Sequence, residues 1–377
     1  MHRFLLDPSL IFLNHGSFGA CPREVLQVCH AWQAEMEANP VEFLGRRSAA
    51  LLAAARAELG RYLGARAEDL AFVANATHGV NIVARSLPLE AGDEVLATDH
   101  EYGACDGAWE FATARRGARY VRAEIPLPFR RGEFADRVWE KVTDRTRVLF
   151  LSHIASTTAL VFPVGELCRR ARAAGILTVI DGAHAPGQLE LDLAALGADF
   201  YTGNCHKWLC APKGSAFLHV RPEHQAVLDA PAVSWGYLAL PANDAYTGTT
   251  PLERKLQWQG TRDLSAFLSV PAAIAFQERN GWAAERVRCH ALAVETLHRV
   301  CAATGLPLPA EDADFGQMAI IPVPAGDAAA LQAGLLRDHR IEVPVTCHKG
   351  SLFVRMSAQA YNTPRDADAL VAALTGR

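Results

Sequence analysis

The sequence has no surplus of charge of either sign. Its 377 residues include 37 basic and 41 acidic side chains, which gives a formal net charge of -4. Without a basic surplus, the chain has no strong electrostatic attraction to the phosphates of nucleic acids or to anionic lipids. We therefore expect neither nucleic acid nor a membrane among its partners.

Long apolar runs and paired cysteine motifs are also missing. Phe4-Leu5-Leu6 is followed at once by Asp7-Pro8, and no uninterrupted apolar stretch approaches the length that crosses a bilayer. The nine cysteines are scattered, without the C-x-x-C spacing that indicates a zinc or redox site. We expect a cytoplasmic protein with reduced, mostly structural thiols and no metal ion.

The periodicity of the sequence changes near its last quarter. Before this point short apolar runs alternate with helical patterns, as in βαβ units, which predicts a mostly parallel sheet. Single long helices are expected at 41–63, ending before Gly64, and at 264–280. From Gly281 onward the elements are typical of a second, α+β unit. The predicted divisions are an N-terminal arm (1–20), a large domain (21–265) and a small C-terminal domain (266–377).

Lys207 stands between two expected strands. Residues 198–202 and 215–220 both have strand patterns, so the lysine lies at a strand-to-loop junction, where α/β enzymes bind ligands. Its neighbours His206 and Trp208 would partly desolvate the amine, which lowers its pKa and makes it a nucleophile toward an aldehyde. From this segment alone, a surface lysine in a loop is an equally good interpretation.

Asp181 comes directly after the apolar run 175–180, at the carboxyl end of a buried strand. A buried carboxylate needs a cationic partner or strong donors, and a protonated pyridine nitrogen is such a partner. A lysine that forms a Schiff base and an aspartate that faces the pyridinium nitrogen are the pair that pyridoxal 5'-phosphate (PLP) demands. Lys207 and Asp181 together therefore predict PLP as the cofactor.

Asn75-Ala76-Thr77 joins a predicted strand, 70–74, to a helical pattern. We predict Thr77 as the N-cap of that helix. The free amides of a helix N-terminus make this turn a suitable seat for a phosphate, although a plain cap is the commoner role of a threonine.

An aromatic side chain follows the next predicted strand, 94–98. Tyr102, or else His100, can stack on a pyridine ring, and either can instead be an ordinary loop residue. The segment is not a zinc-binding H-E-x-x-H motif, because position 104 is alanine.

Arg355 lies inside an apolar strand pattern, 351–357. Alternation places it on one face with Phe353 and Ser357. A guanidinium group there needs a carboxylate and suits two-pronged binding of an amino acid's α-carboxylate. A structural Asp or Glu partner is the alternative.

Several motifs, in this order, resemble the class V aminotransferase family of fold-type I PLP enzymes. They are Asn75-Ala76-Thr77, Asp181-Gly182-Ala183-His184, His206-Lys207-Trp208 and Phe353-Val354-Arg355-Met356-Ser357. Three others look like the isopenicillin N epimerase-like branch: Leu13-Asn14-His15-Gly16-Ser17-Phe18-Gly19, His100-Glu101-Tyr102-Gly103-Ala104 and Gly203-Asn204-Cys205-His206-Lys207-Trp208. The resemblance covers nearly the whole chain.

The resemblance implies a fold-type I PLP-dependent transferase fold, α/β, with a mostly parallel seven-stranded sheet in the large domain and a smaller α+β C-terminal domain. It implies that Lys207 holds PLP and then acts as the base at Cα, and that Arg355 binds the substrate carboxylate. The cofactor contacts that it implies are Asn75, Ala76, Thr77, Tyr102, Ser156, Asp181, His184, Asn204 and His206.

The resemblance also implies a homodimer with composite active sites. Gly260-Thr261 would contact the cofactor phosphate held by the neighbouring subunit, although a plain hinge is the interpretation that the residues alone favour. The N-terminal arm would close over the site, with Asn14 and His15 as substrate contacts. Aromatic residues in the loop 231–250, namely Trp235, Tyr237 and Tyr246, suggest an aromatic lining for the substrate side chain.

Four functions remain open at this level. An epimerase-like or C–S lyase-like enzyme acting at Cα of an amino acid comes first, and an aminotransferase second. A cysteine desulfurase comes third, because Cys347, eight residues before Arg355, stands on a turn that is too short for its catalytic loop. A non-catalytic regulatory dimer is disfavoured, since it has no need of Lys207.

Overall fold

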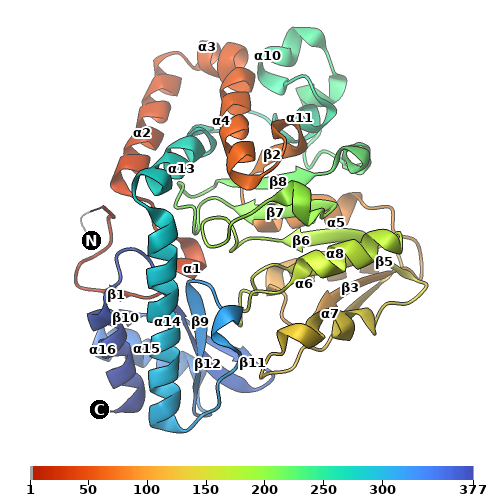
Figure 1. Ribbon diagram of the computed structural model, residues 1–377. Coiled ribbons are helices and arrows are strands. Elements are labelled where there is room, and N and C mark those ends of the chain that lie inside the picture. The colour runs from red at the N-terminus through yellow and green to blue at the C-terminus, as the bar shows by residue number, and fades with distance from the viewer. Residues whose placement is uncertain (1–2, 377) are drawn as a thin grey trace.

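The computed structural model describes residues 3–376. It contains a large unit built on a seven-stranded sheet and a smaller unit, blue in Figure 1, that holds the C-terminal end of the chain. Within the described residues, no helix is both long enough and apolar enough to cross a membrane.

The large sheet is parallel except at one strand. β8 runs antiparallel to both of its neighbours, and every other pairing is parallel. The prediction of a mostly parallel seven-stranded sheet is therefore confirmed. In spatial order the strands are β2 (Leu70–Val73), β8 (Ala216–Val220), β7 (Phe200–Asn204), β6 (Leu177–Asp181), β5 (Thr146–Ser152), β3 (Glu94–Thr98) and β4 (Arg119–Ala123).

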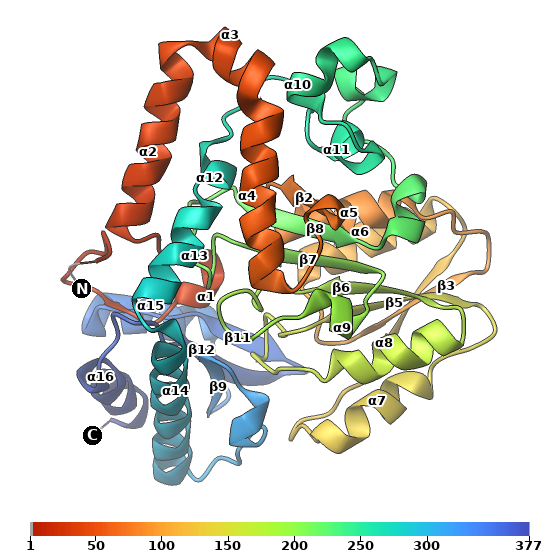
Figure 2. The ribbon, with the colours of Figure 1, turned by 45° about the horizontal axis from the view of Figure 1, so that its top comes forward.

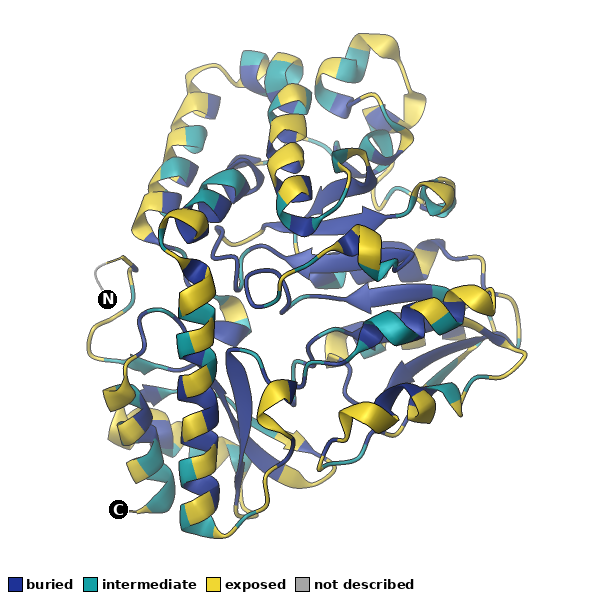
Figure 3. Ribbon diagram, viewed as in Figure 1, coloured by how far each residue is buried: buried dark blue, intermediate teal, exposed yellow. Residues whose placement is uncertain are grey.

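Helices cover both faces of this sheet. Along β5 the side chains alternate, so that Val148 and Phe150 pack with α5 and α6, while Leu149 and Leu151 pack with α7 and α8. Figure 3 shows most of the strands buried between these layers, whereas the edge strand β4 is largely exposed or intermediate. The helices of this unit are α1 (His15–Phe18), α2 (Arg23–Ala38), α3 (Pro40–Glu42), α4 (Ser48–Leu63), α5 (Ala76–Ser86), α6 (Gly103–Ala114), α7 (Arg131–Trp139), α8 (Val164–Ala173), α9 (Leu193–Leu196), α10 (Asp244–Thr247), α11 (Pro251–Leu256), α12 (Ser265–Leu268) and α13 (Val270–Arg279).

The smaller unit is built on a three-stranded antiparallel sheet. Its strand order is β11 (Val345–His348), β12 (Ser351–Ser357) and β9 (Met318–Val323), and its helices are α14 (Trp282–Thr304), α15 (Ala328–His339) and α16 (Pro364–Thr375). The N-terminal arm joins it, because β1 (Ile11–Phe12) pairs with β10 (Ile341–Glu342). α13 lies beyond the predicted domain boundary at 265, yet it packs against α2 and α4 (Figure 2). That boundary stays a prediction.

Two predicted helices are interrupted. The pattern at 41–63 contains a π-helical turn, Phe43–Arg47, between α3 and α4, although Gly64 ends the helix in the left-handed conformation as predicted. The pattern at 264–280 is divided into α12 and α13. Pro271 lies in the first turn of α13, and proline lacks the N–H that a continuous helix would use there.

Candidate active site

A cavity of about 230 Å³ lies at the carboxyl ends of β5, β6 and β7. This is the edge at which open α/β sheets bind their ligands. The predicted cofactor contacts that line it are Asn75, Ala76, Thr77, Tyr102, Ser156, Asp181, His184, Asn204, His206 and Lys207. The lining residues that were not predicted are Ser17, Phe18, Ser152, Ile154 and Ala183.

Lys207 projects into this cavity next to a histidine. Its Nζ lies 3.1 Å from Nε2 of His184, and the Nδ1 of that histidine accepts a hydrogen bond from Nε1 of Trp208 at 3.2 Å. Desolvation and the nearby Arg355 charge lower the pKa of Lys207 to about 8, against the opposing effect of Asp181. Burial also lowers the pKa of His184. The lysine is therefore a poised amine in a weakly solvated site.

Asp181 ends β6 with its carboxylate almost fully buried. Oδ1 accepts from the Ala183 amide at 2.9 Å, and the Cys105 thiol lies 3.5 Å from Oδ2. Burial raises the pKa of the Asp181 carboxyl, and among the described residues no side chain forms an ion pair with it within 4.0 Å. A cationic ligand group would supply the partner that this carboxylate lacks.

The turn before α5 corrects one prediction. Asn75, not Thr77, is the N-cap: its side chain accepts from the amide of His78 at 2.8 Å, and Thr77 lies inside the first turn. Asparagine is at least as good an N-cap as threonine, and the helix therefore begins two residues earlier than predicted. Asn204, predicted as a cofactor contact, accepts from the Ala76 amide at 2.8 Å and thereby ties this turn to β7.

The two aromatic residues predicted after β3 to stack on the cofactor lie in different surroundings. Tyr102 lines the cavity with 46% of its surface exposed. His100 is buried away from it: its Nε2 donates to the Ile125 carbonyl at 2.8 Å, and Nδ1 lies 2.7 Å from the Thr158 hydroxyl. Stacking of Tyr102 on the cofactor stays a prediction.

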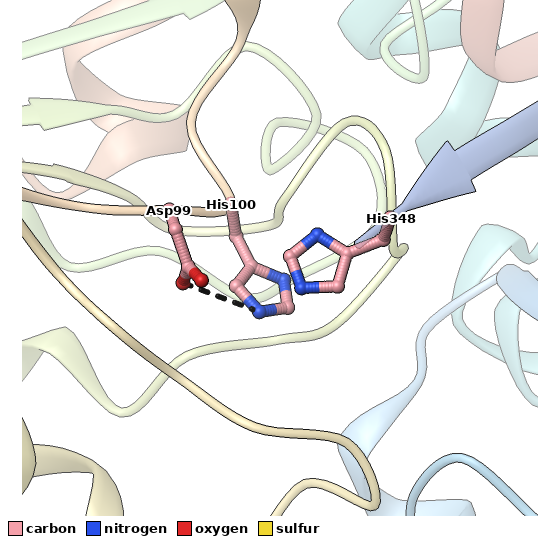
Figure 4. A group of neighbouring side chains, drawn as sticks. All are labelled: Asp99, His100 and His348. Carbon is pink, nitrogen blue, oxygen red and sulfur yellow. Dashed lines mark ion pairs between the residues drawn. The ribbon is translucent and has the colours of Figure 1, made fainter. Parts of the chain in front are cut away.

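His100 belongs to a cluster with Asp99 and His348 that joins the two units (Figure 4). The histidine rings lie 4.1 Å apart, and Lys349 pairs with Asp99 at 2.8 Å. A metal ion would have to displace Lys349 and break the bond from His100 to Ile125. The donor atoms thus suit an interdomain contact better than a metal site.

Arg355 is 5% exposed and reaches two serines of the cavity wall. It donates to the carbonyl and hydroxyl of Ser156 and, at 3.0 Å, to the Ser17 hydroxyl. Its Nε has no hydrogen-bond partner, and no Asp or Glu among residues 3–376 pairs with it. Desolvation lowers its pKa to about 10. A buried guanidinium without an acid is suited to a ligand carboxylate.

The predicted arm contacts do not reach the cavity. His15 is fully buried, and its ring nitrogens lie 3.0 Å from the Tyr361 hydroxyl and the Lys207 carbonyl. Asn14 accepts from Ser17, so it orients a partner of Arg355. The sequence signal for Ser17 and Phe18 was available in the same glycine-rich segment.

Residues expected from the second subunit lie outside the cavity of this chain. Gly260 and Thr261 do not line it, and neither do the aromatic residues predicted for the substrate side chain. Trp235 and Tyr237 are 54% and 69% exposed, whereas Tyr246 packs against Trp258.

Glu101 is a buried acid that the sequence did not single out. Its Oε2 accepts from Ser152, which lines the cavity, and Oε1 accepts from the Thr98 hydroxyl, both at 2.6 Å. Burial raises the pKa of Glu101 to about 8. The side chain therefore links the ends of β3 and β5 close to the Asp181 charge.

The family model described as aminotransferase class-V matches residues 11–370. The chain belongs to this family. The predicted family is confirmed, and PLP, on which the family depends, is its cofactor. The cavity fits that group, because it combines a weakly solvated lysine, an unpaired aspartate and a helix N-terminus.

Relatives within this family support the predicted reactions. An isopenicillin N epimerase of Amycolatopsis lactamdurans is 42% identical over 382 residues, covering 98% of this chain and 95% of that protein. A probable chloroplastic L-cysteine desulfhydrase of Arabidopsis thaliana is 29% identical over 406 residues, covering 98% and 83%. The fold is shared with the solved cystine C–S lyase C-DES, in complex with its reaction product cysteine persulfide, with a TM-score of 0.83 at 22% identity and coverage of 98% of both chains. The chain is thus a PLP-dependent enzyme, and the comparisons support an epimerase or C–S lyase.

Proposed function

We propose that the enzyme removes the Cα proton of an α-amino acid derivative and returns a proton to the opposite face. The observation that carries this proposal is the full-length similarity to an isopenicillin N epimerase. It is supported by Arg355, which has no acidic partner and whose charge acts on Lys207. The substrate class that follows is a compound with a free α-amino group and an α-carboxylate, such as an α-aminoadipyl compound.

Each chemical requirement of this reaction has a side chain in the cavity wall or in contact with it. When bound, PLP supplies an aldehyde for amines and an electron-withdrawing ring. Arg355, oriented by Ser17 and Ser156, binds the substrate carboxylate and fixes which Cα bond faces Lys207. Lys207, with its lowered pKa, takes the proton from Cα. Asp181 provides the negative charge that keeps a ring nitrogen protonated.

Opposite-face proton return needs a second acid, and Tyr102 is our candidate. Its side chain lines the cavity together with Lys207. His15, predicted from the sequence as a substrate contact, is enclosed by Tyr361 and the Lys207 carbonyl and is not among the residues that line the cavity.

C–S cleavage is the second candidate, because desulfhydrases are among the relatives. The same proton removal at Cα serves both reactions, and the outcome then depends on whether a sulfur substituent can leave from Cβ. A desulfurase is less favoured. Cys347 lies on strand β11, opposite Leu352 of strand β12, and does not line the cavity.

The working form proposed is a homodimer in the cytoplasm. An exposed apolar segment supports the dimer, with Val233, Trp235, Tyr237, Leu238 and Leu240 each at least 44% exposed. If a second copy of the chain covers this segment, Gly260-Thr261 of one subunit would approach the cavity of the other subunit. All nine cysteines are free, as is typical of a reducing compartment.

The decisive experiment incubates the PLP-loaded enzyme with L- and D-amino acids in heavy water. The panel includes α-aminoadipyl compounds and cysteine conjugates, and proton NMR is combined with chiral separation. We expect Cα deuteration with inversion for an α-aminoadipyl compound. Pyruvate and a thiol product would instead establish the lyase, and keto-acid formation with conversion of PLP to its amine form would establish an aminotransferase.

A further inference from the structure

The hydrogen bonds around His184 fix where its proton lies. An indole N–H can only donate, so Nδ1 of His184, 3.2 Å from Nε1 of Trp208, must accept. Burial keeps this histidine neutral by lowering its pKa. A neutral imidazole that accepts at Nδ1 carries its single proton on Nε2.

That proton points at the reacting amine. Nε2 of His184 is 3.1 Å from Nζ of Lys207. An ammonium group has three donors and no acceptor, so it would oppose the Nε2 proton. A neutral amine has a lone pair and can accept it. The contact therefore favours the free base of Lys207.

From this geometry we infer that Trp208 is a positioning residue, which sets the tautomer of His184 and through it holds Lys207 as a neutral amine. The inference rests on the proposed role of Lys207 as the reacting amine. It also assigns a function to a tryptophan that touches no cavity space, since Trp208 is fully buried.

The indole is held too firmly to turn away from His184. Gln277 donates to the Trp208 carbonyl at 2.7 Å, and the His15 ring lies 4.9 Å from the indole. Gly187 has a φ of 94°, and a Cβ added there would lie 2.2 Å from the Trp208 carbonyl carbon. These contacts hold the backbone of Trp208 in place, and the fully buried ring packs against His15 with its N–H directed at His184.

Other charges around Lys207 act alongside this contact. Arg355 lowers its pKa, and Asp181 and Cys105 raise it. All three remain in place in Trp208→Phe. That variant also removes ring atoms from a buried site, so comparison with the same change in a His184→Gln background isolates the histidine contact.

The test measures the Lys207 amine in the apo-protein, so it does not depend on which reaction the enzyme catalyses. The rate of Lys207 modification by trinitrobenzenesulfonate is followed against pH by peptide mass spectrometry. In Trp208→Phe, Nδ1 loses its donor and can take the proton, so Nε2 can accept from an ammonium group. We expect the pKa of Lys207 to rise by about one unit. At a pH below the pKa of both the wild type and the variant, this lowers the fraction of free amine about tenfold.

Trp109→Phe is the matched control, because Trp109 is also fully buried but its Nε1 has no partner among the described residues. We expect no shift there. In a His184→Gln background the Trp208→Phe change should have no further effect on Lys207. Nitrogen-15 NMR of the wild-type apo-protein should show His184 protonated at Nε2. A proton on Nδ1, or equal shifts in the two tryptophan variants, would overturn the inference.

Discussion

Two arginines of this enzyme are buried alike but partnered differently. Arg56 is 4% exposed and pairs with Glu253 and Gln257, whereas Arg355 is 5% exposed and, among residues 3–376, donates its hydrogen bonds to serines alone. Taking a guanidinium from water is costly unless an acid compensates it. Where the chain supplies the acid, the charge serves the fold, and where it does not, the charge is available to a ligand.

Removing the reacting amine should have the largest effect. Lys207→Ala should abolish turnover and the covalent adduct fixed by borohydride, because within the described part of the chain no second lysine lines the cavity. Peptide mapping of the reduced protein measures this. Lys213→Ala, on the loop after Lys207, is the control and should keep the adduct; an adduct on another lysine of Lys207→Ala would refute the assignment.

Breaking the paired arginine should reduce stability. Arg56→Met leaves the partly buried Glu253 without its arginine and should lower the free energy of unfolding by up to about 3 kcal/mol. Urea unfolding measures the change. The double variant Arg56→Met/Glu253→Leu should recover most of it, since no charge is then left unpaired; a double variant as unstable as the single one would contradict this.

Removing the unpaired arginine should instead reduce binding. Arg355→Gln should weaken amino-acid binding by about 2–5 kcal/mol and leave stability unchanged or higher. Titration of the bound cofactor's absorbance measures the affinity, and Arg355→Lys, which keeps the charge but not the fork, should lie between the two. If stability fell as in Arg56→Met, Arg355 would be a structural residue.

Glu101 extends the comparison to an acid buried without a cation. The folded chain keeps its proton up to about pH 8, whereas the ordinary pKa is 4.5. The folded state therefore binds more protons between these values, and its stability falls as the pH rises through this window. Glu101→Gln should flatten this part of the pH profile in urea unfolding, while Glu58→Gln, on the exposed side of α4, should leave it unchanged.

The positions of the main site residues could be predicted because strand ends have a sequence signal. Asp181 and Lys207 follow apolar runs, and Arg355 interrupts one, so periodicity alone places them at an edge or on a face. The roles of Ser17 and Glu101 could not be predicted, because their partners lie on other segments. The N-cap was predicted at Thr77 but lies at Asn75, because two good capping residues occur within three positions.

The sequence by itself determined the family, the cofactor and the mostly parallel sheet, since these depend on local periodicity and on motifs in a fixed order. Only the tertiary structure decided which charges remain unpaired. In the folded chain His15 is enclosed and Arg355 has no acidic partner. Trp208 contacts His184, which in turn contacts Lys207. Burial and hydrogen-bond direction arise from segments that are distant in the chain, and they decide which buried groups are free to react.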